Sequence, residues 1–148
     1  METPRKDRVL NHAHTVLELP LVLEAIAGQA RSVPGRERVL ALAPPDRPES
    51  ARNAQKLYAD LLACEAEGDA PPPAAPPDLR PELARLALEG ATLRGEELWR
   101  IGLLLDQVRS LVTWHRKAQR ETPALNDVLA ALDPLDPLHR EITRTLDP

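Results

Sequence analysis

Two histidines near the start of the sequence have a spacing suited to metal binding. His12 and His14 form a His-x-His pair, and Asp7 and Glu18 are candidate further ligands. The pair lies in a polar segment without a cysteine, and the one cysteine of the chain, Cys64, rules out any multi-cysteine metal site. We therefore assign no metal site.

The sequence has neither of the glycine-rich loops that bind nucleotide phosphates. It contains no Gly-x-Gly-x-x-Gly and no Gly-x-x-x-x-Gly-Lys-Ser/Thr motif, and its six glycines are scattered singly. His115 and His139 have no serine or cysteine beside them in a nucleophile motif, so we interpret them as core or surface histidines. Cys64 is interpreted as a small hydrophobic residue on a helix. These patterns predict no catalytic residues and no cofactor in this chain, and so no enzyme.

Basic side chains are the remaining candidates for a binding function. Arg109, Arg116 and Arg120 fall within about 40° of one another on a helical wheel, with Lys117 to one side, and such a stripe suits a phosphate backbone. Arg36 belongs to a second basic group, at a predicted corner between helices. The alternative is a solvated helix surface, which the formal net charge of -4 favours because it gives no general attraction to polyanions.

The composition predicts packed helices. Of 148 residues, 43% are hydrophobic and 28% are charged, but there is no Phe, one Tyr and two Trp, so Leu, Ala, Val and Ile must fill the core. No stretch approaches the roughly 18 apolar residues of a membrane span. We predict an all-α, bundle-like domain of about six or seven helices over residues 15–148, in the cytoplasm and without a membrane partner, preceded by a flexible extension over residues 1–14.

Proline and glycine divide the chain into expected helices. The pattern of apolar residues at spacings of three and four predicts helices over residues 20–30, 39–43, 48–68, 78–90, 95–121, 123–132 and 136–146. Pro34 and Gly35 are read as a corner after the first helix. The stretch DAPPPAAPPD, residues 69–78, holds five of the sixteen prolines and is read as an extended connector with polyproline character. A proline-rich ligand for a partner domain is its alternative interpretation.

The longest predicted helix, residues 95–121, is apolar on two sides. Its broad face, which we assign to the core, consists of Leu98, Ile101, Leu104, Leu105, Val108, Leu111 and Val112. Trp99, Leu103 and Trp114 lie together at a different angle of the wheel. Burial between two neighbouring helices explains them, and a partner or dimer interface is the alternative, because Trp is frequent at interface hot spots.

Two stretches carry a resemblance to a known family: HTVLELPLVLEAIAGQARSVPGRERVLALAP and PDLRPELARLALEGATLRGEELWRI. Their short motifs are, in order, Leu17-Glu18, Gly35-Arg36-Glu37, Leu42-Ala43-Pro44, Asp78-Leu79-Arg80-Pro81 and Leu93-Arg94-Gly95-Glu96-Glu97-Leu98. The series resembles the N-terminal core and lever region of the second-type MutS-like proteins, which are bacterial paralogues of the mismatch-repair ATPase. Arg94 departs from the pattern, because the family usually has a serine-like cap at that position, and a missing cap costs about 1 kcal/mol.

The resemblance implies functions that belong mostly to the whole parent protein. Family members are homodimers with an ATPase domain, which uses ATP and Mg, and a small C-terminal nuclease domain, and both domains would lie beyond Pro148. They bind branched DNA, suppress recombination and in some bacteria engage stalled or collided ribosomes. The implied partners of this segment are the remaining domains of the parent chain, a second copy in a homodimer, and branched DNA or the ribosome through the parent.

The leading functional hypothesis is a non-catalytic helical scaffold that mediates inter-domain or dimer contacts through Trp99, Leu103 and Trp114. The runner-up is a nucleic-acid-binding module for branched DNA or rRNA that uses Arg109, Arg116, Arg120, Lys117 and Arg36.

Overall fold

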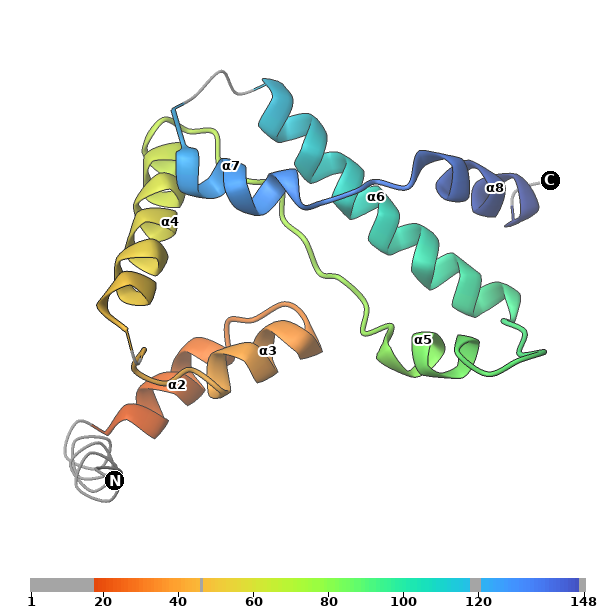
Figure 1. The fold of residues 1–148 in the computed structure, drawn as a ribbon, viewed down its shortest axis with the longest axis horizontal. Helices are drawn as coiled ribbons and strands as arrows, with labels where there is room; N and C mark the ends of the chain where they lie inside the picture. Colours follow the sequence, from red (N-terminus) through yellow and green to blue (C-terminus); the bar gives the residue numbers. More distant parts are fainter. Residues whose placement is uncertain (1–17, 46, 118–120, 147–148) are drawn as a thin grey trace. The chain divides into compact units, whose positions relative to one another are not determined.

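Every regular element that the computed structural model describes is a helix, which confirms the predicted all-α fold class (Figure 1). The structure describes residues 18–45, 47–117 and 121–146. In chain order the helices are α2 (Leu19–Ala27), α3 (Val33–Leu40), α4 (Pro48–Ala66), α5 (Arg80–Leu86), α6 (Gly95–Lys117), α7 (Pro123–Ala130) and α8 (Asp136–Leu146). Within the described ranges, none of these helices combines the length and the apolar character that a membrane span requires.

Contacts divide the chain into two compact units, Met1–Ala43 and Pro44–Pro148. The expectation of a single domain over residues 15–148 therefore stays a prediction. The predicted flexible extension, residues 1–14, lies outside the described residues, and with it His12, His14 and Asp7.

The first unit holds α2 and α3, packed against each other. The predicted corner at Pro34 and Gly35 is wrong, because both residues lie in the first turn of α3, where a proline loses no hydrogen bond. Ser32 is the N-cap and its Oγ accepts the backbone N–H of Gly35 at 3.1 Å. A Cβ at residue 35 would stand 2.8 Å from that oxygen, so glycine permits the close cap. The turn between the helices is thus formed by residues 28–32.

One end of the second unit is a small core between α4 and α7. Cys64, Leu125 and Leu129 are buried together, and Leu57, Leu61, Trp114 and Leu132 pack against them. Cys64 is 1% exposed, which confirms its interpretation as a small buried residue on a helix. The core therefore joins two helices that residues 67–122 separate in the sequence.

Asp60 of α4 caps the start of α7 from a distance. Thr122, the N-cap residue of α7, makes no capping bond with its side chain, whereas Oδ2 of Asp60 accepts the backbone N–H of Leu125 at 3.0 Å. Because Asp60 satisfies an end group of another helix, it ties α7 to α4.

We expect Asp60→Ala to lower the free energy of unfolding by about 1 kcal/mol, as for other caps. Urea unfolding followed by circular dichroism measures this, and Asp127→Ala, an exposed carboxylate of α7, is the control; equal effects of the two substitutions would contradict the cap.

The other end of the second unit is the packing of α8 on α6. Two glycines seven residues apart let α8 approach: a Cβ at Gly95 would lie 3.6 Å from Leu146 Cδ2, and one at Gly102 would lie 3.4 Å from Ile142 Cγ2. Of the seven residues of the predicted broad apolar face of α6, Leu105 is buried in the core and the other six are half-buried. The predicted helix end at residue 121 is wrong, since Lys117 is the last helical residue described before residues 118–120 and Glu121 is not helical.

Candidate interaction surfaces of the long helix

The proline-rich connector is bound along α6 by three side chains spaced seven residues apart. Trp114 Nε1 donates to Asp69 Oδ1 at 3.0 Å, Gln107 Nε2 donates to the carbonyl of Ala75 at 3.4 Å, and Arg100 Nη2 donates to the carbonyl of Asp78 at 2.7 Å. Seven residues are close to two helical turns, so the three donors lie on one side of α6. We call Arg100, Gln107 and Trp114 the donor ladder.

The donor ladder gives the connector a role within the chain. Residues 69–79 contain no regular helix or strand, as the sequence predicted, but they run antiparallel to α6 and mostly lie half-buried. Asp69 and Asp78, at its two ends, both take part in the ladder. The connector is therefore part of the packed unit and has an internal partner.

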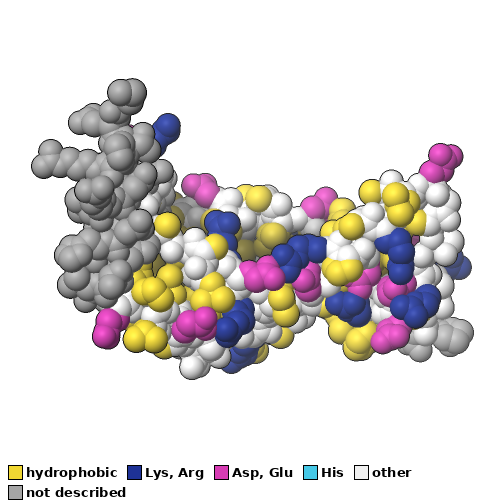
Figure 2. Space-filling view, turned by 90° about the horizontal axis from the view of Figure 1, so that it is seen from below, with side chains coloured by type: hydrophobic (Ala, Val, Ile, Leu, Met, Phe, Trp, Pro, Cys, Tyr) yellow, Lys and Arg dark blue, Asp and Glu magenta, His cyan; other side chains and the backbone are white. Residues whose placement is uncertain are grey.

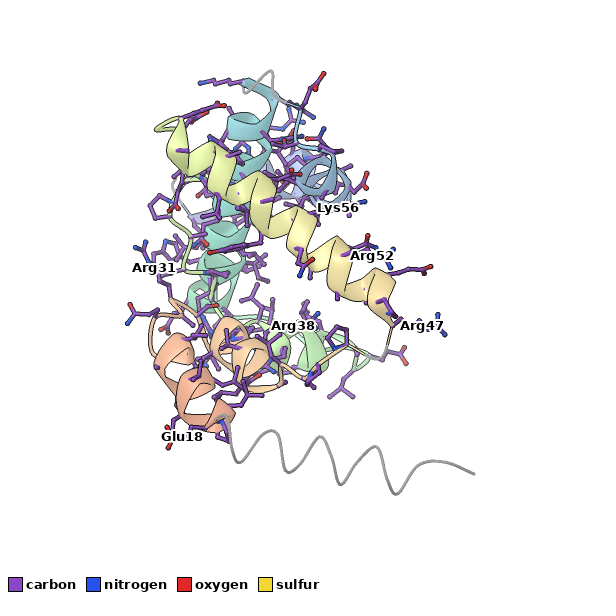
Figure 3. All side chains as sticks on the ribbon, turned by 90° about the vertical axis from the view of Figure 1, so that its left-hand side faces the viewer. Glu18, Arg31, Arg38, Arg47, Arg52 and Lys56 are labelled. Atoms are coloured by element: carbon purple, nitrogen blue, oxygen red, sulfur yellow. The ribbon has the colours of Figure 1, made fainter. Side chains whose placement is uncertain are left out.

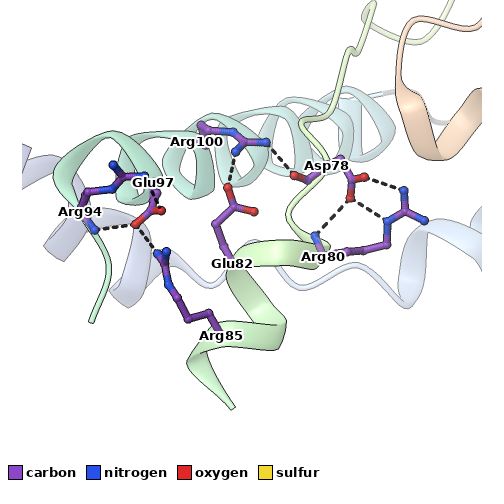
Figure 4. Close-up of polar contacts among 7 residues, drawn as sticks. All are labelled: Asp78, Arg80, Glu82, Arg85, Arg94, Glu97 and Arg100. Carbon is purple, nitrogen blue, oxygen red and sulfur yellow. Dashed lines mark hydrogen bonds and ion pairs between the residues drawn. The ribbon is translucent and has the colours of Figure 1, made fainter. Parts of the chain in front are cut away.

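Two ion pairs, each with a carboxylate that is mostly buried and an arginine that is partly exposed, join α5 to α6 (Figure 4). Glu82 of α5 is 5% exposed and its Oε1 accepts a hydrogen bond from Nη1 of Arg100. One turn earlier on α6, Oε2 of Glu97 accepts a bond from Nη2 of Arg85 of α5. Arg100 thus serves two elements at once, because one nitrogen of its guanidinium binds the connector and the other binds α5.

Glu97 also forms a hydrogen bond with the backbone at the start of α6. Arg94 has no capping hydroxyl, but the carboxylate of Glu97 accepts the backbone N–H of Arg94 at 2.7 Å, which is the glutamate half of a capping box. The hydrogen bond from Arg85, followed by that from the Arg94 backbone, lowers the pKa of Glu97 to about 2. In the same region the side-chain hydrogen bond of Arg80 lowers the pKa of Asp78 to about 2. Arg94 supplies no side-chain cap, and Glu97 satisfies instead the backbone N–H of Arg94 itself.

His139 of α8 is the centre of a polar contact with α6. It is 8% exposed, its Nε2 lies 2.8 Å from Asp106 Oδ1, and its Nδ1 lies 2.9 Å from Arg109 Nη1. A guanidinium only donates, so Nδ1 accepts and the Nε2 proton goes to Asp106. Arg109 Nε also pairs with Asp136 at 3.1 Å. The arrangement positions α8, and of the two interpretations of His139, core or surface, the structure shows the buried one.

The predicted arginine stripe is only partly a free surface. Arg109 is engaged by His139 and Asp136, and Arg36, in the first unit, pairs with Glu24 at 2.9 Å. Arg116 and Lys117 are exposed in the last turn of α6. Arg120 lies outside the described residues. On the face drawn in Figure 2, basic and acidic side chains alternate and form no large patch of one sign.

The three residues of the predicted second face of α6 contact different parts of the chain. Trp99 is 55% exposed and, with Leu103, lines a groove of about 360 Å³ beside His139, Ile142 and Leu146 of α8. Trp114 lies 15 residues further on, about 22 Å along the helix, against the core of α4 and α7. A partner interface at Trp99 and Leu103 stays a prediction, whereas contacts within the chain account for Trp114.

The residues that sequence reasoning missed are Arg100, Gln107 and Glu82. The spacing of Arg100, Gln107 and Trp114 was visible in the sequence, but nothing in it named the connector as their partner.

Within the described ranges, no three His, Cys, Asp or Glu side chains lie close enough together to hold a metal ion. The polar groups of α6 that we describe mainly join neighbouring elements to it. No protein-family model, no curated protein and no solved structure matches this chain.

Proposed function

We propose that this chain is a non-catalytic helical scaffold that holds other elements or partner molecules in fixed positions. The observation that carries the proposal is the use of the polar side chains of α6: the donor ladder binds the connector, Arg100 and Glu97 bind α5, and Asp106 and Arg109 bind α8. Groups of this chemistry serve catalysis or ligand binding when they converge on a cleft. Here each of them has a partner on a neighbouring element, although Asp106 and Arg109 also line an open groove of about 650 Å³.

The parent protein of such a scaffold, in this proposal, is a second-type MutS-like ATPase and nuclease of the cytoplasm. The support is the order of the short motifs from Leu17-Glu18 to the start of α6. The segment would connect the remaining domains of the parent, and branched DNA or the ribosome would be bound by the parent as a whole. ATP and Mg would belong to those other domains.

The second candidate is direct binding of branched DNA or rRNA. It is favoured by Arg116 and Lys117, two exposed cations in the last turn of α6 that form no ion pair within the described residues. Arg109, the other described member of the predicted stripe, is already paired with Asp136. Two free cations give a smaller electrostatic contribution than the six to ten phosphate contacts of a typical DNA-binding protein.

A labelled four-way DNA junction, titrated with the chain and followed by fluorescence anisotropy, separates the two candidates. For a scaffold we expect no saturable binding at physiological salt, and no difference between the chain and the Arg116→Gln/Lys117→Gln variant. Arg140→Gln/Arg144→Gln, which removes two exposed cations of α8, is the matched control. Tight binding that weakens with salt, and weakens further in the α6 variant alone, would replace the scaffold proposal by the nucleic-acid one.

A further inference from the structure

The outer face of α4 carries a line of side chains that is separate from the core-facing Leu57, Leu61 and Cys64. Its members are Arg47, Ala51, Gln55, Tyr58, Leu62 and Glu65. The five from residue 51 to residue 65 fall within about 80° on a helical wheel, and Arg47 is the N-cap residue just before the helix. Tyr58 is 64% exposed and Leu62 is 45% exposed. The line thus has a positive end, a negative end and, between them, the exposed Tyr58 and Leu62 with Ala51 and Gln55.

The charges of α4 run against its helix dipole. Arg47, Arg52 and Lys56, labelled in Figure 3, are exposed in the N-terminal half, where Glu49 is an acidic exception, and Glu65 and Glu67 are exposed at the C-terminal end. A helix dipole favours the opposite placement, with acidic groups first and basic groups last. The side-chain charges therefore interact unfavourably with the dipole of their own helix. If a second helix with the same charge order lies antiparallel to the first, the basic half of each helix faces the acidic half of the other, and this attraction offsets the unfavourable interaction.

We infer that α4 is a self-association surface, on which α4 of a second copy of this chain lies antiparallel. A two-fold axis near residue 56 sets Arg47 against Glu65 of the second copy, Ala51 against Leu62, and Gln55 against Tyr58. Such a contact is isologous, since both copies use the same patch. The inference deepens the proposed scaffold function and rests on it, because it names the partner and the surface that the scaffold uses.

A second copy fits this line because α4 itself supplies both the exposed Tyr58 and Leu62 and the complementary charges at the two ends. The helix has 19 residues and is about 28 Å long. Two such helices bury less than the roughly 800 Å² per partner of a standard stable interface. The association is accordingly weak and reversible, and it weakens with added salt because its charges are exposed.

Sedimentation velocity of the full 148-residue chain, over a range of concentrations and at two salt concentrations, tests the inference. We expect a dimer fraction that rises with concentration. Arg47→Glu and Glu65→Arg each place like charges together and weaken the dimer at least about tenfold, and the double variant Arg47→Glu/Glu65→Arg restores it. Glu89→Arg, an exposed charge reversal outside α4, leaves the association unchanged.

The charge reversals cannot act by melting α4, because each of them improves the match to the helix dipole. Circular dichroism of each variant verifies this, and Tyr58→Ser gives a second, uncharged way to weaken the contact. A monomer at every concentration, single reversals without effect, or a double variant that does not recover would each overturn the inference. These outcomes leave the scaffold proposal standing, since that proposal is decided by the DNA junction titration with variants of α6.

Discussion

Replacing Arg100 by methionine is expected to lower the free energy of unfolding by about 3–5 kcal/mol, the usual cost of leaving a buried charge without its partner. Glu82 is 5% exposed, and its second oxygen, Oε2, is buried without a hydrogen-bond partner within the described residues. Arg100 therefore supplies the counter-charge for this carboxylate. The substitution also removes the bond to the carbonyl of Asp78, so the connector and α5 both lose their attachment to α6.

Urea unfolding followed by circular dichroism measures this loss. The control is Arg144→Met, because the Arg144–Glu141 pair on α8 is exposed at both ends and exposed pairs contribute about 0–1 kcal/mol. Adding Glu82→Leu to Arg100→Met should recover much of the loss, since no charge is then buried alone. If Arg100→Met costs no more than Arg144→Met, the buried pair does not hold α5 in place.

The second large effect is the acid sensitivity of Glu97. Its pKa is lowered from 4.5 to about 2 in the folded chain, so folding favours the ionised form. A carboxyl group with a lowered folded pKa contributes stability that is present above pH 4.5 and is lost as the pH falls from 4.5 towards 2. We therefore expect the thermal midpoint of the chain to fall in this range, and to fall less steeply in Glu97→Gln, which is less stable at neutral pH.

Glu96→Gln is the matched control for this titration. Glu96 is the exposed neighbour of Glu97 in the first turn of α6, so the substitution removes the same charge without touching Arg85 or the Arg94 backbone. Thermal unfolding of the three proteins between pH 2 and pH 7 compares them. Parallel pH profiles of the chain and Glu97→Gln would mean that the contacts of Glu97 do not depend on its charge.

The helices of this protein were largely predictable because their apolar periodicity and their proline and glycine boundaries are local signals. The extent of α8, residues 136–146, agrees with the prediction, and α4 and α6 begin where the sequence predicted. One error arises because the same residue types favour two different local structures. Pro34 and Gly35 suit a corner and equally suit a first helical turn, and the Ser32 cap decides for the turn.

The polar contacts were much less predictable, because they join residues far apart in the chain. Arg100 contacts Glu82 and Asp78 across 18 and 22 residues, and Asp60 caps α7 across 65 residues. The helical wheel placed Arg109 and Arg116 on one stripe but carried no information on α8, which supplies the partners of Arg109. Likewise the wheel grouped Trp99 with Trp114, although Trp99 lines a groove beside α8 and Trp114 packs against α4 and α7.

The composition of the connector also bears on the solubility of the protein. Five of the ten residues 69–78 are prolines, which have no backbone N–H to donate. Two backbone carbonyls of the segment, those of Ala75 and Asp78, already accept hydrogen bonds from Gln107 and Arg100. An extended segment with exposed N–H and C=O groups is a template on which other chains can add as β-strands and aggregate. The connector has too few backbone N–H donors for such strand pairing. We therefore expect that this extended segment does not promote aggregation.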